Sequence, residues 1–170
     1  MIKVSFQLTS IKTEKLSKKQ IFNICQLKQA YWKYNFNSQI NWFNNNIRKN
    51  DLHNHLFLGN ELIGYTCLRK CQFVFQNNKY NFLLFDTLCV HKDFVEQGYG
   101  KKIMEFNNYI IKKKYLPAFL FCESNLINFY KKYGWKKVEQ KSRKNKFLMA
   151  FNTKPIIKNY LKKFLYNFIK

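Results

Sequence analysis

Two glycines that lie close together constrain this chain more than any other feature. The chain has only five glycines among 170 residues, and Gly98 and Gly100 are separated by a single residue. They follow the apolar residues 82–85 and precede residues 103–111, whose apolar side chains recur at helical spacing. A glycine turn between a strand and a helix exposes backbone N–H groups to a phosphate. We therefore expect a phosphate-binding loop, with positive φ and close ligand approach at Gly100, although Gly-x-Gly alone also suits a plain tight turn.

Two stretches resemble the signatures of the GCN5-related N-acetyltransferase (GNAT) family. Residues 88–104 are similar to its acetyl-CoA-binding motif, and residues 125–135 to its second signature. In that second signature an Asn precedes a helix that contains a Tyr, here Asn125 and Tyr130. The first motif departs from the family pattern at Val95, where Arg or Gln is usual.

The resemblance implies a cofactor and the residues that hold it. Acetyl-CoA would bind as co-substrate, without a metal, through backbone amides of the loop and of the preceding strand. The cofactor-binding residues implied are Leu88, Cys89, Val90, Gln97, Gly98, Tyr99, Gly100, Lys101 and Asn125.

The hydrophobic pattern predicts an α/β (α+β) fold, with a mixed, mostly antiparallel twisted sheet and flanking helices. The expected order is β-α-α-β-β-β-α-β-α-β-β, as in the family that the chain resembles. Predicted strands cover residues 3–9, 55–58, 62–68, 71–75, 81–90, 118–122, 135–139 and 147–151. A capping box from Ser17 to Gln20 opens the first predicted helix. The second covers residues 39–47, and the third runs from after Gly100 to about residue 114. The fourth is capped by Ser124 or Asn125 and ends near residue 134.

The chain is predicted to form a single acyltransferase domain over residues 1–153. Residues 154–170 carry an apolar helical stripe with lysines beside it, which predicts a basic amphipathic helix. We expect this helix to pack on its own domain or on a partner subunit. Formation of a homodimer is therefore one of the expected alternatives. Binding to a membrane surface is the alternative.

The amino-acid composition limits the classes of partner that we expect. The formal net charge is +22, from 31 basic and 9 acidic residues. Almost all of the basic residues are lysines, whereas readers of nucleic acid favour Arg for its forked donors, so no nucleic-acid partner is expected. No apolar run approaches the ~20 residues of a membrane span. Five scattered cysteines without metal-ligand spacing indicate reduced thiols, a cytoplasmic location and no metal.

Acetyl transfer to an amine needs a base for the amine and an acid for the leaving thiolate. The resemblance implies Tyr130 as the acid, and core packing is its alternative. Asp86 is the favoured base because a carboxylate amid apolar strand residues is costly unless it is paired or used. A structural hydrogen bond is its alternative, and Glu123 is the second candidate base.

The predicted function is direct transfer of an acetyl group from acetyl-CoA to the primary amine of a small anionic or neutral molecule. The stretch 51–53, with Gly64 and Tyr65, has a weaker local similarity to aminoglycoside 2′-N-acetyltransferases, so an antibiotic acceptor stays open. A protein or peptide amine is a further alternative. The non-enzymatic alternative is a basic RNA- or membrane-binding protein on a degenerate fold of this kind.

Overall fold

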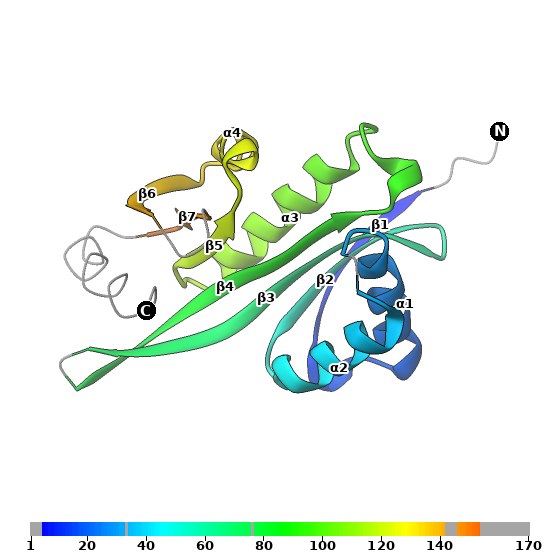
Figure 1. The fold of residues 1–170 in the computed structure, drawn as a ribbon, viewed down its shortest axis with the longest axis horizontal. Coiled ribbons are helices and arrows are strands. Elements are labelled where there is room, and N and C mark those ends of the chain that lie inside the picture. Colours follow the sequence, from blue (N-terminus) through cyan, green and yellow to red (C-terminus); the bar gives the residue numbers. More distant parts are fainter. Residues whose placement is uncertain (1–4, 33, 76, 142–145, 154–170) are drawn as a thin grey trace. The chain divides into compact units, whose positions relative to one another are not determined.

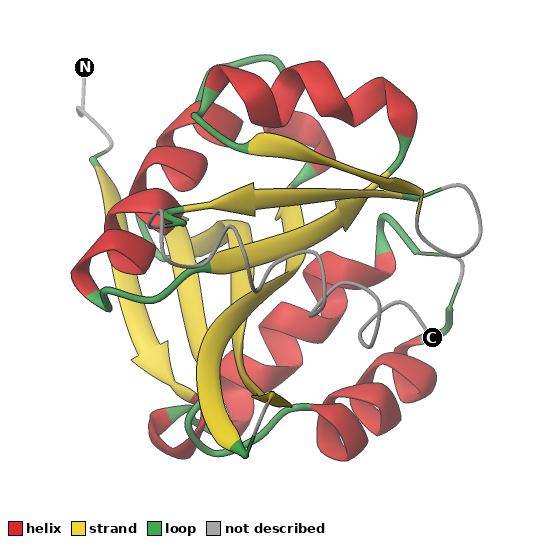
Figure 2. Cartoon of the chain, turned by 90° about the vertical axis from the view of Figure 1, so that its left-hand side faces the viewer, coloured by secondary structure: helices red, strands yellow, loops and turns green. Residues whose placement is uncertain are grey.

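The computed structural model describes residues 5–32, 34–75, 77–141 and 146–153 (Figure 1). Its strands form a seven-stranded sheet in the order β1-β2-β3-β4-β5-β7-β6, and helices flank the sheet (Figure 2). The strands are β1 (Phe6–Lys12), β2 (Leu52–Leu58), β3 (Glu61–Phe75), β4 (Asn78–Val90), β5 (Ala118–Cys122), β6 (Lys136–Lys141) and β7 (Phe147–Phe151). The helices are α1 (Lys18–Gln29), α2 (Phe36–Asn46), α3 (Tyr99–Lys113) and α4 (Ile127–Lys132). The predicted fold class and element order are confirmed.

The chain divides into two compact units. Unit 1 contains Met1–Arg69 and Asp86–Asn107, and unit 2 contains Lys70–Phe85 and Asn108–Lys170. Strands β3 and β4 and helix α3 run through both units, so a single domain over residues 1–153 stays a prediction. The predicted C-terminal helix lies outside the described residues.

In unit 1, helices α1 and α2 cover one face of the strands, where Ile24, Leu27 and Phe43 pack in one cluster with Tyr65. A second cluster joins Leu56 and Ile63 to Ile103 at the start of α3. The β2–β3 register shifts after Leu56, so Ile63 has no partner and the alternation changes side there. Gly64 lies in this second cluster because a Cβ there would meet Leu56 at 3.2 Å.

In unit 2, β4 pairs with β5 in parallel at Leu83 and Leu84, and β5 pairs antiparallel with β7. Phe82, Phe119 and Leu148 form the core of these strands. Buried Trp135 donates from Nε1 to Asn108 Oδ1 at 3.0 Å, which ties the residue after α4 to helix α3.

Several local predictions need correction. Residues 62–68 and 71–75 belong to the single strand β3, since the charged pair at 69–70 does not interrupt its ladder. Helix α2 begins earlier than predicted because the Asn35 side chain accepts the Ser38 N–H at 2.8 Å. Neither Ser124 nor Asn125 caps a helix, since residues 124–126 form a 3-10 turn that begins without a side-chain cap. The capping box of Ser17 and Gln20 is confirmed.

Candidate active site

The predicted glycine loop connects β4 to α3 and is braced by its own side chains. Gln97 donates from Nε2 to the Asp93 carbonyl at 2.8 Å, so this side chain holds the loop. Glu96 and Gly98 have φ values of 65° and 82°. The Lys102 N–H donates to the Gly98 carbonyl at 3.2 Å, which makes Gly98 the residue from which the helix starts. Positive φ at Gly100 was wrongly expected: that residue already lies inside α3.

The first turn of α3 is suited to an anion. The N–H groups of Tyr99, Gly100 and Lys101 precede Lys102, whose N–H makes the first hydrogen bond of the helix, and they carry the positive end of the helix dipole. A Cβ on Gly100 would meet only Val90 Cγ2, at 4.0 Å, so the protein itself leaves the space above this backbone open. Lys101 is exposed and lies 3.9 Å from Glu105 Oε1.

The end of β4 lies against the same cluster as the loop, since Leu88, Val90 and Tyr99 pack around Ile103. The β4–β5 register ends at Leu84, and β4 continues to Val90. The Val90 carbonyl accepts a hydrogen bond from the Tyr31 hydroxyl. The structure therefore brings the cofactor-binding residues predicted on β4 together with those of the loop.

Cys89 lies between Leu88 and Val90 on β4, and its thiol is buried. It donates to the Tyr65 carbonyl at 3.9 Å, and burial raises its pKa to about 12. A thiol that keeps its proton at neutral pH is a poor nucleophile, which disfavours an acyl-cysteine intermediate.

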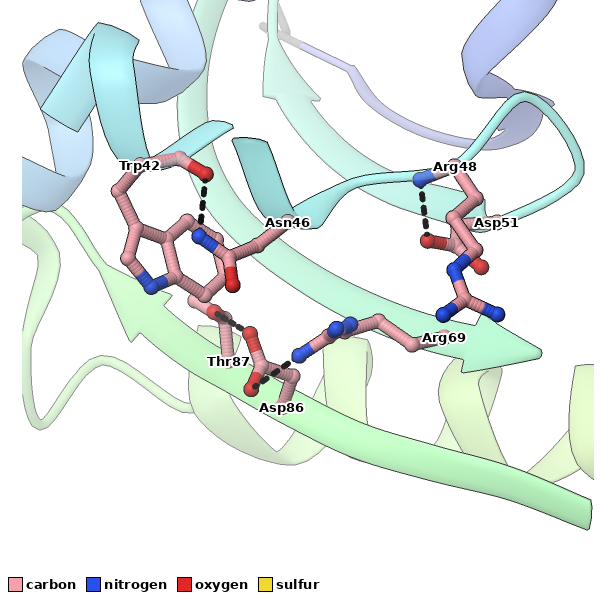
Figure 3. Close-up of polar contacts among 7 residues, drawn as sticks. All are labelled: Trp42, Asn46, Arg48, Asp51, Arg69, Asp86 and Thr87. Carbon is pink, nitrogen blue, oxygen red and sulfur yellow. Dashed lines mark hydrogen bonds and ion pairs between the residues drawn. The ribbon is translucent and has the colours of Figure 1, made fainter. Parts of the chain in front are cut away.

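Asp86 is held on β4 by the neighbouring strand (Figure 3). Arg69 of β3 points toward it, with 3.8 Å between Nη1 and Oδ1, and Thr87 Oγ1 donates to Oδ2 at 3.5 Å. Burial raises the pKa of Asp86, and the charges of Arg69 and Lys28 only partly oppose that effect. Asp86 therefore combines partial exposure with a raised proton affinity, as a general base requires.

Asp51 takes a structural part in this region. Its Oδ2 accepts the Arg48 N–H at 2.8 Å, closing the loop between α2 and β2 (Figure 3). The side chain is buried. Sequence reasoning singled out Asp51 but missed Arg69, whose signal was its scarcity, since the chain has only three arginines.

Tyr130 lies in unit 2, on α4, in an aromatic cluster. Its ring contacts Phe85, Phe129 and Trp135, with centroids 5.2–6.3 Å away. Burial raises its pKa above the ordinary value for a phenol. Within the described residues no group accepts the proton of its hydroxyl. Tyr130 is therefore both a packing residue and a phenol whose proton is not engaged.

The other predicted residues of unit 2 are exposed. Glu123 begins the 3-10 turn after β5, and Asn125 lies within that turn. The Glu123 carbonyl accepts the Leu126 N–H at 3.1 Å, but neither side chain takes part in the hydrogen bonds or ion pairs of the described residues. The burial that makes Asp86 an attractive base is thus absent at Glu123.

Among the described residues, no group of three His, Cys, Asp or Glu side chains could hold a metal ion. No helix in this part of the chain is long and apolar enough to cross a membrane.

Strands flanked by helices, with an anion-accepting helix start after a central strand, define an acyltransferase-like α/β protein. The model of the acetyltransferase (GNAT) domain family matches residues 52–137, about half of the chain. The chain belongs to this family and is an N-acetyltransferase.

Solved structures share the fold. Escherichia coli ElaA matches with a TM-score of 0.68 at 16% identity, over 86% of this chain and 99% of its own. An acyl-CoA N-acyltransferase from Pseudomonas aeruginosa matches with a TM-score of 0.69 at 16% identity, over 86% and 99%. The PaiA N-acetyltransferase of Thermoplasma acidophilum, solved with coenzyme A, matches with a TM-score of 0.59 at 19% identity, over 86% and 98%. A search of curated proteins found no match.

Proposed function

We propose that this protein transfers an acetyl group from acetyl-CoA directly to the primary amine of a small anionic or neutral molecule. The observation that carries the donor half is the turn at Gly98, which starts α3 with free N–H groups and leaves open space over Gly100. The family and the coenzyme A in the Thermoplasma structure support the same donor.

In this proposal the pyrophosphate of coenzyme A binds the amides of residues 97–101 and the ammonium group of Lys101. The backbone of residues 88–90 holds the pantetheine arm and polarises the thioester carbonyl, as hydrogen-bond donors do for a developing oxyanion. Asn125 contributes from the turn before α4.

Asp86 is assigned the role of base. It takes a proton from the acceptor ammonium, and the free amine nitrogen then attacks the thioester carbon. The nitrogen of the tetrahedral intermediate then loses a second proton to solvent, and collapse of the intermediate breaks the C–S bond and releases acetylated amine and thiolate. The raised pKa of Asp86 supports this role, because a carboxylate with a higher proton affinity is a stronger base.

Tyr130 is assigned the role of acid, donating its proton to the thiolate and recovering one from solvent. The raised pKa of the phenol makes this transfer more uphill than the ~2 kcal/mol that ordinary pKa values imply. The same burial also destabilises a thiolate, so the two effects partly cancel.

The preference for an anionic or neutral acceptor rests on charge. A net charge of +22 attracts anions and disfavours a ligand with several ammonium groups. Aminoglycosides and peptide amines remain the alternatives.

The test is release of free coenzyme A from acetyl-CoA, measured with aminoglycosides, with amino sugars and their phosphates, with amino acids and with lysine-bearing peptides. We expect turnover with a monoamine that is anionic or neutral overall. A strong preference for an aminoglycoside would overturn the acceptor proposal, and a lack of acetyl-CoA binding would overturn the donor site.

A further inference from the structure

Lys28 is a buried cation that forms no ion pair within the described part of the chain. The residue is 7% exposed and lies on the inner side of α1. Its Nζ lies 4.0 Å from the ring centroid of Trp42 and 5.7 Å from that of Trp32. Among the described residues, no group accepts a hydrogen bond from Nζ or forms an ion pair with it. A buried ammonium without a pair is costly, and contact with an aromatic ring returns only part of that cost.

Arg69 lies over the same indole, with Cζ 5.9 Å from the centroid of Trp42. Its pair with Asp86 is long, at 3.8 Å, and joins a single nitrogen to a single oxygen. Guanidinium has five N–H donors in a planar fork, so most of the donors of Arg69 remain for another acceptor. Arg69 and Asp86 are equally exposed, at 22% of each side chain, and solutes can therefore reach both.

The two cations of this cluster are only weakly compensated. Lys28 and Arg69 share the Trp42 ring, and among the described residues Asp86 forms a long ion pair with Arg69 and acts on Lys28 without pairing with it. Burial lowers the pKa of Lys28, as expected for a cation that lacks a close counter-charge. An anionic group bound here would offset that effect and would also strengthen Asp86 as a base.

We infer that Lys28 and Arg69, seated on Trp42, bind a carboxylate or phosphate group of the acceptor, next to Asp86. This anion subsite rests on the proposed function and narrows it to small amines that carry an oxyanion close to the reacting nitrogen. The amine must lie close to that oxyanion, because Arg69 itself contacts the proposed base. A charged group on the acceptor would then select the substrate locally, in addition to the overall positive field.

The first test compares matched acceptors in the unmodified protein, with acetyl-CoA saturating. Glycine and serine are compared with their methyl esters, and glucosamine 6-phosphate with glucosamine. We expect kcat/KM to be about 10- to 100-fold higher for one of the anionic members, the range expected for charge-assisted hydrogen bonds. The set of acceptors with the larger ratio of kcat/KM also shows whether the site prefers a carboxylate or a phosphate. Equal rates within all three pairs would overturn the inference.

The second test uses variants. Lys28→Met and Arg69→Gln should each raise KM about tenfold or more for the anionic acceptor and change KM for its neutral partner little. Lys28→Arg should retain much of the preference. Lys19→Met removes an exposed charge from the same helix and controls for the overall field. Equal losses with both members of a pair would assign Lys28 to stability or proton transfer and contradict the subsite.

The third test needs no turnover. Two of the chain's three tryptophans, Trp32 and Trp42, contact Lys28, so their fluorescence reports on the site. Titration with inorganic phosphate and with acetate should give a saturable change that is lost in Lys28→Met and kept in Lys19→Met. A response without catalysis would refute the proposed function while supporting the subsite. No response to either anion would refute the subsite.

Discussion

At the scale of single residues, the surroundings of Asp86 set the pKa of the proposed base. A carboxylate on a half-buried strand loses hydration, and one long contact with Arg69 does not restore it. The result is a raised pKa on a side chain that ligands can reach. The neighbouring strand therefore decides whether this carboxylate acts as a base, since a closer pair with Arg69 would have lowered its pKa instead.

Replacing Asp86 with Asn should abolish the acidic limb of the pH–rate profile. In the unmodified protein, protonation of Asp86 should lower kcat/KM as pH falls toward its pKa, which lies above the ordinary value. The variant should be slower by about 10²-fold and should not show that limb. Glu14→Gln, at an exposed carboxylate, is the control. Persistence of the limb would move the role to Glu123 or to water.

Replacing Tyr130 with Phe should lower kcat by about 10²-fold and leave acetyl-CoA affinity nearly unchanged, because the ring packing is kept while the donated proton is lost. Tyr133→Phe, at the C-cap residue of α4, is the control. Single-turnover kinetics and calorimetry separate the two quantities. Unchanged turnover would leave Tyr130 as a packing residue.

At the scale of elements, the start of α3 makes an anion site only if the chain before it turns sharply. Gly98 makes that turn with φ of 82°, and the Gln97 side chain fixes the loop from within. Gly100 has a different role. It follows the turn, and because it has no side chain the backbone of the first turn of α3 stays accessible.

The pair Gly98→Ala and Gly100→Ala should separate these roles. A Cβ at Gly98 meets no atom within 4 Å but is strained by the left-handed backbone, which costs about 1–2 kcal/mol of stability. Ala at Gly100 should keep or raise stability, since Ala favours a helix by up to about 1 kcal/mol. It should still weaken acetyl-CoA binding through contact with the ligand.

Thermal unfolding and calorimetry of both variants give the two quantities. Equal destabilisation by both changes would contradict the assignment of the turn to Gly98. Unchanged acetyl-CoA affinity in Gly100→Ala would remove this backbone from the donor site.

At the scale of the whole molecule, burial of polar groups sets how the fold responds to acid. His53 is hydrogen-bonded through both ring nitrogens, to Tyr65 at 2.7 Å and to Thr13 at 2.8 Å. His55 lies two residues further along the same strand, and its Nε2 is buried without a hydrogen-bond partner among the described residues. Burial lowers the pKa of His53 to about 3 and of His55 to about 4, so both are neutral in the folded protein.

Stability should therefore fall as pH is lowered below the ordinary histidine pKa of 6.5. The unfolded chain binds protons there that the folded chain excludes, at about 1.4 kcal/mol per pH unit for each histidine. Denaturant unfolding between pH 7 and 4.5 measures this slope. The double change His53→Gln and His55→Asn should flatten it, whereas His91→Gln, at a half-exposed loop position, should not. An unchanged slope in the double variant would contradict this account.

Much of this protein could be predicted from local signals in its sequence. The glycines around Tyr99, the capping box at Ser17 and the alternation along the strands each act over a few residues, so the order of elements and the family were accessible without a structure. Tyr130 could be proposed because the second signature carries its position, and Asp86 because a carboxylate among apolar strand residues is costly unless it is paired or used.

Only the tertiary structure assigned positive φ to Gly98 instead of Gly100, joined two predicted strands into β3, and brought Lys28, Arg69 and Trp42 around Asp86. These three residues come from α1, β3 and α2, and no periodicity in the sequence links them. Their effect depends on burial and on distances between charges, which are set when separate elements pack. The chemistry expected of the chain was thus local information, whereas its proposed selectivity arises from contacts between residues far apart in sequence.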